Sequence, residues 1–86
     1  DLDGAEQMQR KALEINEKLG RLEGIANTYV NLGNVLMIRH DLDAAQQMYR
    51  KALELAERLD SPEMIAKMTS FLGTLREWRP ETGNGV

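Results

Sequence analysis

Residues 41–59 read DLDAAQQMYRKALELAERL, and residues 1–19 read almost the same, DLDGAEQMQRKALEINEKL. When the sequence is shifted by 40 residues, 19 of the 40 aligned positions are identical. The match weakens after residue 20 but resumes further on, where Leu32-Gly33 aligns with Leu72-Gly73. A fixed period of ~20–50 residues is typical of stacked structural units, each too small to bury its apolar face without a neighbour. The sequence therefore predicts a repeat protein.

Apolar side chains within residues 41–59 recur at steps of three and four, which is the period of one face of an α-helix. They are Leu42, Ala45, Met48, Tyr49, Ala52, Leu53, Ala56 and Leu59. The other segments carry similar patterns, separated by short breaks that favour antiparallel helix pairs. We predict four helices, at residues 3–19, 23–39, 43–59 and 62–79.

Acidic residues mark the predicted starts of two of these helices. Asp3 is followed three residues later by Glu6, and Asp43 by Gln46. This spacing lets the two side chains of each pair bond to the free backbone N–H groups of the first turn. We therefore predict Asp3 and Asp43 as the N-caps.

The last helix has signals at both ends. Ser61 followed by Pro62 is a cap with proline in the first turn, and Pro80 stops the helix. Residues 80–86 carry no periodicity, so we predict a loose tail there. The chain then divides into a repeat array at residues 1–79 and a C-terminal tail.

Gly33 lies in the middle of a predicted helix, where glycine costs ~1 kcal/mol relative to alanine. Its recurrence as Gly73 indicates a helix contact too close for a larger side chain.

The residues around Gly33 form a pattern over two predicted helices. The first helix carries a large residue, then Leu-Gly, then another large residue, and the next helix carries an alanine, an aromatic residue and a second alanine. These residues are Tyr29, Leu32, Gly33, Leu36, Ala45, Tyr49 and Ala52. The pattern resembles tetratricopeptide repeats, in which each unit is a pair of antiparallel helices.

The period of 40 residues exceeds the ~34 of the usual tetratricopeptide unit. The extra residues fit at 57–62, and the sequence resembles the longer-period members, which carry an Asn-Leu-Gly-Asn run like residues 31–34. Armadillo and HEAT repeats have a similar period of ~40–47 residues, and the Leu-Gly and alanine pattern separates the chain from them. The match weakens at both ends, where Gln9 replaces the aromatic residue and Thr69 and Arg76 replace large ones.

The resemblance implies an all-α, antiparallel helix-hairpin solenoid. Its four helices follow the order B-A-B-A, where A and B are the first and second helices of a unit. Residues 1–20 then form a half repeat, residues 21–60 a full repeat and residues 61–79 another half repeat.

The composition disfavours several classes of function. The chain has 11 basic and 14 acidic residues, a net charge of −3 and both signs interleaved, so we expect no surface for nucleic acid. It has no cysteine, which removes disulfides and thiolate chemistry. No apolar run reaches the ~18 residues that a membrane span needs. We predict a cytoplasmic protein with no nucleic acid or membrane partner.

Few side chains are candidates for catalysis or metal binding. His40 is the only histidine and lies in a predicted turn beside Asp41, where an exposed or capping role is favoured over a base or a ligand. The acid pairs Asp1/Asp3 and Asp41/Asp43 lack the longer ligand series of a calcium loop, and capping explains them better. We therefore predict that the protein is not an enzyme and holds no cofactor or metal ion.

Three asparagines, Asn27, Asn31 and Asn34, follow one another at steps of four and three on one helical face. In tetratricopeptide arrays the A helices line a concave groove, and relatives with similar Asn-Leu-Gly-Asn runs use asparagines there to bond the backbone of an extended peptide. An amide both donates and accepts, which suits peptide groups. The resemblance therefore implies a groove of Asn27, Val30, Asn31, Asn34, Lys67, Ser70 and Thr74. The alternative is a solvated face whose amides bond between helices.

The B-A-B-A order leaves the first helix without a preceding partner and the last without a following one. We expect apolar surface at both ends, formed by Met8, Leu13, Leu75 and Trp78. Two such ends suit head-to-tail stacking of copies, unless the chain is a piece of a longer array.

We predict a non-catalytic module that binds a protein or peptide in its groove. The alternative function is self-assembly through the unpaired end helices.

Overall fold

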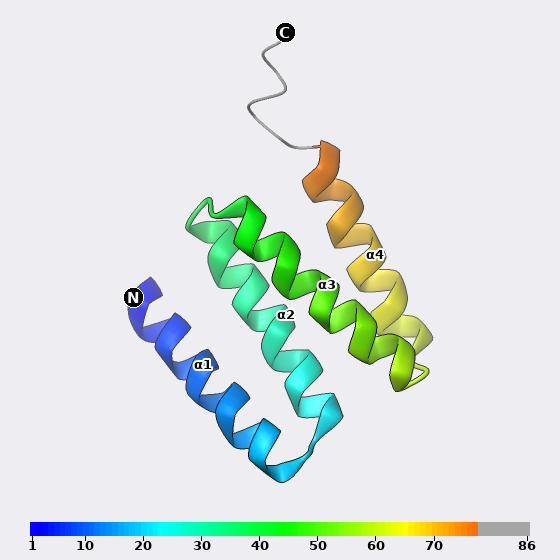
Figure 1. The fold of residues 1–86 in the computed structure, drawn as a ribbon. Coiled ribbons are helices and arrows are strands. Elements are labelled where there is room, and N and C mark those ends of the chain that lie inside the picture. The colour runs from blue at the N-terminus through cyan, green and yellow to red at the C-terminus, as the bar shows by residue number, and fades with distance from the viewer. Residues whose placement is uncertain (78–86) are drawn as a thin grey trace, which may run out of the picture.

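The computed structural model describes residues 1–77, and Figure 1 shows them as four helices. These are α1 (Leu2–Leu19), α2 (Leu22–Ile38), α3 (Leu42–Arg58) and α4 (Pro62–Glu77). Equivalent helices begin 40 residues apart, at Leu2 and Leu42 and at Leu22 and Pro62. The part of the chain that the structure describes contains no strand, so the predicted all-α class is confirmed. The predicted end of the last helix and the predicted tail lie outside the described residues.

The helices begin at different caps from those that we predicted. Asp1 caps α1, where its carboxylate accepts from the N–H of Asp3 at 3.2 Å. Asp41 caps α3, where its carboxylate accepts from the N–H of Ala44 at 3.3 Å. The prediction of Asp3 and Asp43 was wrong because the leucine between each pair of acids already belongs to the helix. An acidic residue in the first turn still suits the positive end of the helix dipole.

The three turns between helices share one geometry. Gly20, His40 and Asp60 all lie in the left-handed region, with φ of 67°, 64° and 56°. In each turn the N–H of the following residue reaches back five positions along the chain, as in the bond from Asp41 to the Leu36 carbonyl at 2.9 Å. This arrangement satisfies carbonyls at the end of each helix and reverses the chain in few residues. It accounts for the exposed position of His40, which agrees with the predicted turn.

Each helix packs on its neighbours along the chain and, within residues 1–77, on no other helix. Figure 1 shows the resulting row, in which α2 and α4 run in roughly the same direction and α1 and α3 run against them. The Cα atoms span 47 × 31 × 14 Å, a thin and elongated body. This is the geometry of a helix-hairpin solenoid and confirms the predicted architecture.

Gly33 allows a close contact between α2 and α3. A Cβ atom on Gly33 would lie 2.5 Å from Cε1 of Tyr49, so the ring of Tyr49 occupies the space that a side chain would need. Ala45 and Ala52, one turn before and after Tyr49 on α3, are fully buried in the same interface. The central pair α2 and α3 is therefore the close-packed hairpin that the Leu-Gly and alanine pattern predicts.

The end faces only partly match the prediction. Met8 on α1 is 70% exposed, as expected of a helix without a preceding partner, and Leu13 is half-buried. Leu75 is buried, with 4% of its surface exposed, so its assignment to a free end face was wrong. It lies two turns beyond Met68 on the side of α4 that packs against α3. Trp78 lies outside the described residues.

Candidate functional site

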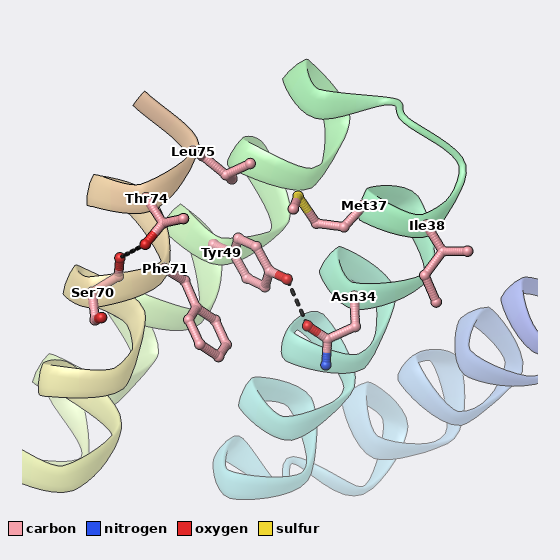
Figure 2. A pocket seen from close by; sticks show the side chains of 8 residues that line it. All are labelled: Asn34, Met37, Ile38, Tyr49, Ser70, Phe71, Thr74 and Leu75. Atoms are coloured by element: carbon pink, nitrogen blue, oxygen red, sulfur yellow. Dashed lines mark hydrogen bonds between the residues drawn. The ribbon is translucent and has the colours of Figure 1, made fainter. Parts of the chain in front are cut away.

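Two hollows lie between α2 and α4, and one of them also reaches Tyr49 of α3. The apolar hollow has a volume of about 460 Å³ and is shown in Figure 2. Its lining residues are Asn34, Met37, Ile38, Tyr49, Ser70, Phe71, Thr74 and Leu75. The polar hollow has about 420 Å³ and is lined by Glu23, Asn27, Val30, Ser61, Glu63, Met64 and Lys67. The two hollows follow one another along α2 and α4, which do not pack on each other, and we refer to them together as the groove.

Tyr49 forms the floor of the apolar hollow and orients Asn34. Its hydroxyl donates to Oδ1 of Asn34 at 2.6 Å, as Figure 2 shows. The ring packs against the backbone of Gly33 and against the ring of Phe71, with 5.2 Å between the two ring centroids and 57° between the ring planes. Burial raises the pKa of Tyr49 above its ordinary value of 10.0, so the phenol keeps the proton that it donates.

The amide nitrogen of Asn34 is the polar group that this arrangement leaves for a ligand. Because Oδ1 is held by Tyr49, the NH₂ group points away from the ring, as Figure 2 shows. Asn34 is exposed, and its nitrogen makes no hydrogen bond to any residue within 1–77. Opposite it on α4, the hydroxyl of Thr74 donates to the carbonyl of Ser70 at 3.0 Å. The apolar hollow thus offers one fixed donor on α2 and hydroxyl oxygens on α4.

The polar hollow carries charge of both signs. Glu23 and Glu63 stand in the first turns of α2 and α4, and Lys67 lies one turn further along α4. All three are exposed, and none forms an ion pair with another described residue. Two carboxylates against one ammonium leave this end of the groove with a net negative charge.

The structure separates the three asparagines of the predicted stripe. Asn27 lines the polar hollow and Asn34 the apolar hollow. Asn31 lines neither, and its amide nitrogen donates to Oε1 of Gln9 on α1 at 3.3 Å. This bond is of the kind that the alternative, interhelix interpretation of the stripe describes. The other predicted residues, Val30, Lys67, Ser70 and Thr74, all line one of the two hollows.

Sequence reasoning missed the apolar part of the groove. Tyr49 was expected as an interhelix contact, yet it also forms the floor of the apolar hollow. Met37 and Ile38 were not singled out, although Ile38 is a large apolar residue that is 61% exposed. The position of Ile38 in the sequence could have identified it as a groove residue, because Ile38 follows Asn27, Asn31 and Asn34 at helical steps on the same face.

A separate charged cluster joins α1 to the end of α2. Arg39 pairs with Asp3 and lies 3.5 Å from Glu6, which also pairs with Arg10 at 2.8 Å.

Within residues 1–77 no group of three or more histidine, cysteine, aspartate or glutamate side chains is placed to hold a metal ion. None of the described helices has both the length and the apolar character needed to cross a membrane.

The sequence profile described as Tetratricopeptide repeat matches residues 1–58 and, in a second alignment, residues 24–75. The matches cover most of the chain, and the protein therefore belongs to the tetratricopeptide repeat family. Members of this family generally mediate protein–protein interactions and are typically non-catalytic scaffolds. Comparison with curated proteins and with solved structures gave no match.

Proposed function

We propose that the chain binds an extended peptide segment of a partner protein in the groove between α2 and α4. The observation that carries the proposal is the pairing of Tyr49 with Asn34. A buried phenol fixes the carbonyl side of the amide at 2.6 Å and leaves the NH₂ group of the exposed Asn34 free to donate. A donor held in this way loses little side-chain entropy when it bonds a peptide carbonyl.

The shape of the groove supports the same function. Both hollows are open, and their walls come from two helices that run alongside each other without contact. Asn27 and Asn34 stand seven residues apart on α2, which places them ~10.5 Å apart along the helix at ~1.5 Å per residue. An extended peptide lying along α2 can therefore meet both amides.

The experiment compares two asparagines that differ in position. A peptide selected from a random display library against the protein is the ligand, and fluorescence anisotropy measures its dissociation constant. We expect Asn34→Ala to weaken binding by ~5–20-fold, the loss of one or two hydrogen bonds, and Asn31→Ala to change it by less than ~2-fold. Equal effects of the two substitutions, or none from Asn34→Ala with an intact helical spectrum, would contradict the groove assignment.

A second candidate function is self-assembly through the end helices, which the exposure of Met8 favours. Three further apolar side chains of α1, Leu2, Ile15 and Leu19, are 37%, 52% and 58% exposed. On α4 a Cβ atom at Gly73 would meet nothing within 4 Å, so that face is open to a helix. Sedimentation velocity over a concentration series tests this function, which predicts growth in mass that Met8→Glu abolishes. A constant monomer mass would leave the groove as the working surface.

The proposed binding requires no cofactor, metal ion or catalytic group. A cytoplasmic location and the absence of a nucleic acid partner stay predictions from the composition. A gel-shift experiment with duplex DNA and single-stranded RNA tests the second of these, and we expect no complex because the net charge is −3.

A further inference from the structure

We propose that the free face of α4 binds α1 of a second copy of the chain, in the register that α2 and α3 adopt within one copy. This inference rests on self-assembly, the second candidate function, and specifies its interface. It depends on two helix faces that no described helix covers, and on the repeat, which shows what covers the equivalent faces inside the molecule.

The two end helices lack the same kind of contact. The helix α3 packs on α2 and on α4, whereas its equivalent, α1, packs on the following helix alone among the described helices. Likewise α2 packs on α1 and on α3, whereas its equivalent, α4, packs on the preceding helix alone. The contact that both lack is therefore the one between α2 and α3. A second copy supplies it, because α4 is the equivalent of α2 and α1 is the equivalent of α3.

The free face of α1 is apolar where the equivalent face of α3 is covered. It consists of Met8, Ile15 and Leu19, which are 70%, 52% and 58% exposed. Their equivalents on α3 are all half-buried, and Leu55, the equivalent of Ile15, lies against Leu22 and Tyr29 of α2. A helix of the α2 kind would remove the same apolar surface of α1 from water.

The free face of α4 carries small residues where α2 meets α3. A Cβ atom at the exposed Gly73 would meet nothing within 4 Å, whereas at Gly33 the ring of Tyr49 fills that space. Ala66 is also exposed, although its equivalent on α2 is fully buried. Small residues let a second helix approach closely. In the proposed register Gln9 of the second copy takes the place of Tyr49 and lies over Gly73.

The charges of the two faces favour the same register. Within one copy the N–H of Asp41 donates to the carbonyl of Leu36 at 2.9 Å, so these residues are neighbours where α2 ends and α3 begins. Their equivalents are Asp1 and Arg76. Arg76 is exposed and forms no ion pair with another described residue. Docking therefore brings the carboxylate of Asp1 from the second copy beside this unpaired guanidinium.

The first experiment mixes two variants that are each blocked at one face. Met8→Glu places a charge on the free face of α1, and Gly73→Glu places one on the free face of α4. Sedimentation equilibrium of the unchanged chain should give a dissociation constant of ~0.1–1 mM, because one helix contact buries less than a standard interface. Each variant alone should stay monomeric. Their equimolar mixture should form a dimer, because each variant keeps the face that the other lacks.

The matched control for Met8→Glu is Gln7→Glu. Gln7 and its equivalent Gln47 are both exposed, so this position is not covered where α2 meets α3. The control should associate as the unchanged chain does. Circular dichroism checks that all the variants keep their helices.

The second experiment tests the register and uses the absence of cysteine from the chain. Chains with Gln9→Cys are mixed with chains with Gly73→Cys, because the equivalent residues Tyr49 and Gly33 are in contact. Under oxidation the mixed disulfide should form at least ~5-fold faster than with Gln7→Cys in place of Gln9→Cys. Equal rates overturn the proposed register.

The outcomes separate this inference from the two candidate functions. A monomer at every concentration overturns both the inference and self-assembly, and the groove stands if the library-selected peptide binds. Association that either blocked variant retains alone overturns the proposed interface but not self-assembly, and so does a mixture that forms no dimer while the unchanged chain associates. If the mixture forms a dimer and no library-selected peptide binds, the groove fails and the inference stands.

Discussion

The packing of α1 on α2 and the packing of α3 on α4 repeat one step of the array with different chemistry. Where α3 meets α4, the rings of Tyr49 and Phe71 lie 5.2 Å apart. At the equivalent positions of α1 and α2, Gln9 and Asn31 form a side-chain hydrogen bond of 3.3 Å. An aromatic contact and an amide pair thus occupy the same place in two copies of one unit.

A second pair of equivalent positions exchanges large and small residues. At the α1–α2 junction Gly24 faces Asn16, which fills the space where a Cβ atom would lie. At the α3–α4 junction the corresponding residues are Met64 and the fully buried Ala56. Helices of similar length and turns of equal geometry therefore set the repeat, and at this second pair of positions the larger side chain comes from α1 in one copy and from α4 in the other.

The equivalent helices α1 and α3 differ in how much they bury. α3, which packs on a helix on each side, has four buried residues, and α1, which packs on α2 alone among the described helices, has none. Met68 on α4 and its equivalent on α2, Thr28, are both buried, but Met68 is apolar whereas the hydroxyl of Thr28 bonds the carbonyl of Gly24 within its own helix at 2.7 Å. We infer that α1 is the least stable part of the described array, and the following predictions test this difference.

The largest expected effect comes from truncating the aromatic residue. Tyr49→Ala should lower the free energy of unfolding by ~3–5 kcal/mol, because it leaves a cavity between α2, α3 and α4. Gln9→Ala, at the equivalent position, should cost less than ~0.5 kcal/mol, since its partner Asn31 is exposed. Urea denaturation followed by circular dichroism measures both values. Similar losses would remove the proposed difference between the junctions.

The two equivalent glycines should respond to alanine with opposite signs. Gly33→Ala should destabilise the protein by ~1–3 kcal/mol, because the new Cβ atom would lie 2.5 Å from the Tyr49 ring. Gly73→Ala should stabilise it by up to ~1 kcal/mol, because the methyl group meets nothing within 4 Å and alanine favours the helix. Thermal unfolding of the two variants side by side is sufficient. A stabilising Gly33→Ala would show that the hairpin is not closely packed.

Converting one junction into the other sharpens the comparison. Gln9→Tyr combined with Asn31→Phe should build an aromatic pair between α1 and α2 and add ~0.5–1.5 kcal/mol. Hydrogen exchange measured by NMR should then show slower exchange of the α1 amides, with little change in α4. Unchanged exchange in α1 would mean that geometry, and not side-chain chemistry, limits its stability.

The smallest effect concerns pH. Burial raises the pKa of Tyr49 in the folded state above 10.0. The contribution of the neutral phenol to the stability of the fold is therefore complete below pH 10 and is lost as pH rises through the folded pKa. The free energy of unfolding should therefore fall above pH 10. Tyr49→Phe should flatten this fall while costing ~0.5–1.5 kcal/mol at neutral pH through the lost bond to Asn34. Tyr29→Phe is the matched control and should keep the dependence.

Much of the fold follows from the sequence because it depends on local signals. The 40-residue repeat and the helical periods located all four helices to within two residues, wherever the structure describes their ends. The caps were misplaced because Asp1 and Asp3, like Asp41 and Asp43, offer two candidates in identical contexts. Which aspartate caps depends on the residue at which the helix begins, and this is Leu2 in one copy and Leu42 in the other.

The site was less accessible to sequence reasoning, because a groove depends on which way each side chain leans between two neighbours. Asn31 and Asn34 share a helical face, yet one leans toward α1 and the other toward α3. Leu75 was assigned to an end face, although the same helix turns it inward. Periodicity predicts which side chains share one face of a helix, but not which helix packs on that face. The neighbouring helix determines whether a side chain lies in the core, at a junction or in the groove.

If α2 and α4 together form the binding surface, side-chain amide NMR detects this in a single titration. On addition of the library-selected peptide, the amide signals of Asn27 and Asn34 and the backbone signals of residues 67–74 should shift most. The signals of Gln9 and Asn31 should move little, because their pair lies at the α1 junction. Shifts concentrated on α1, around Met8 and Ile15, would contradict the account.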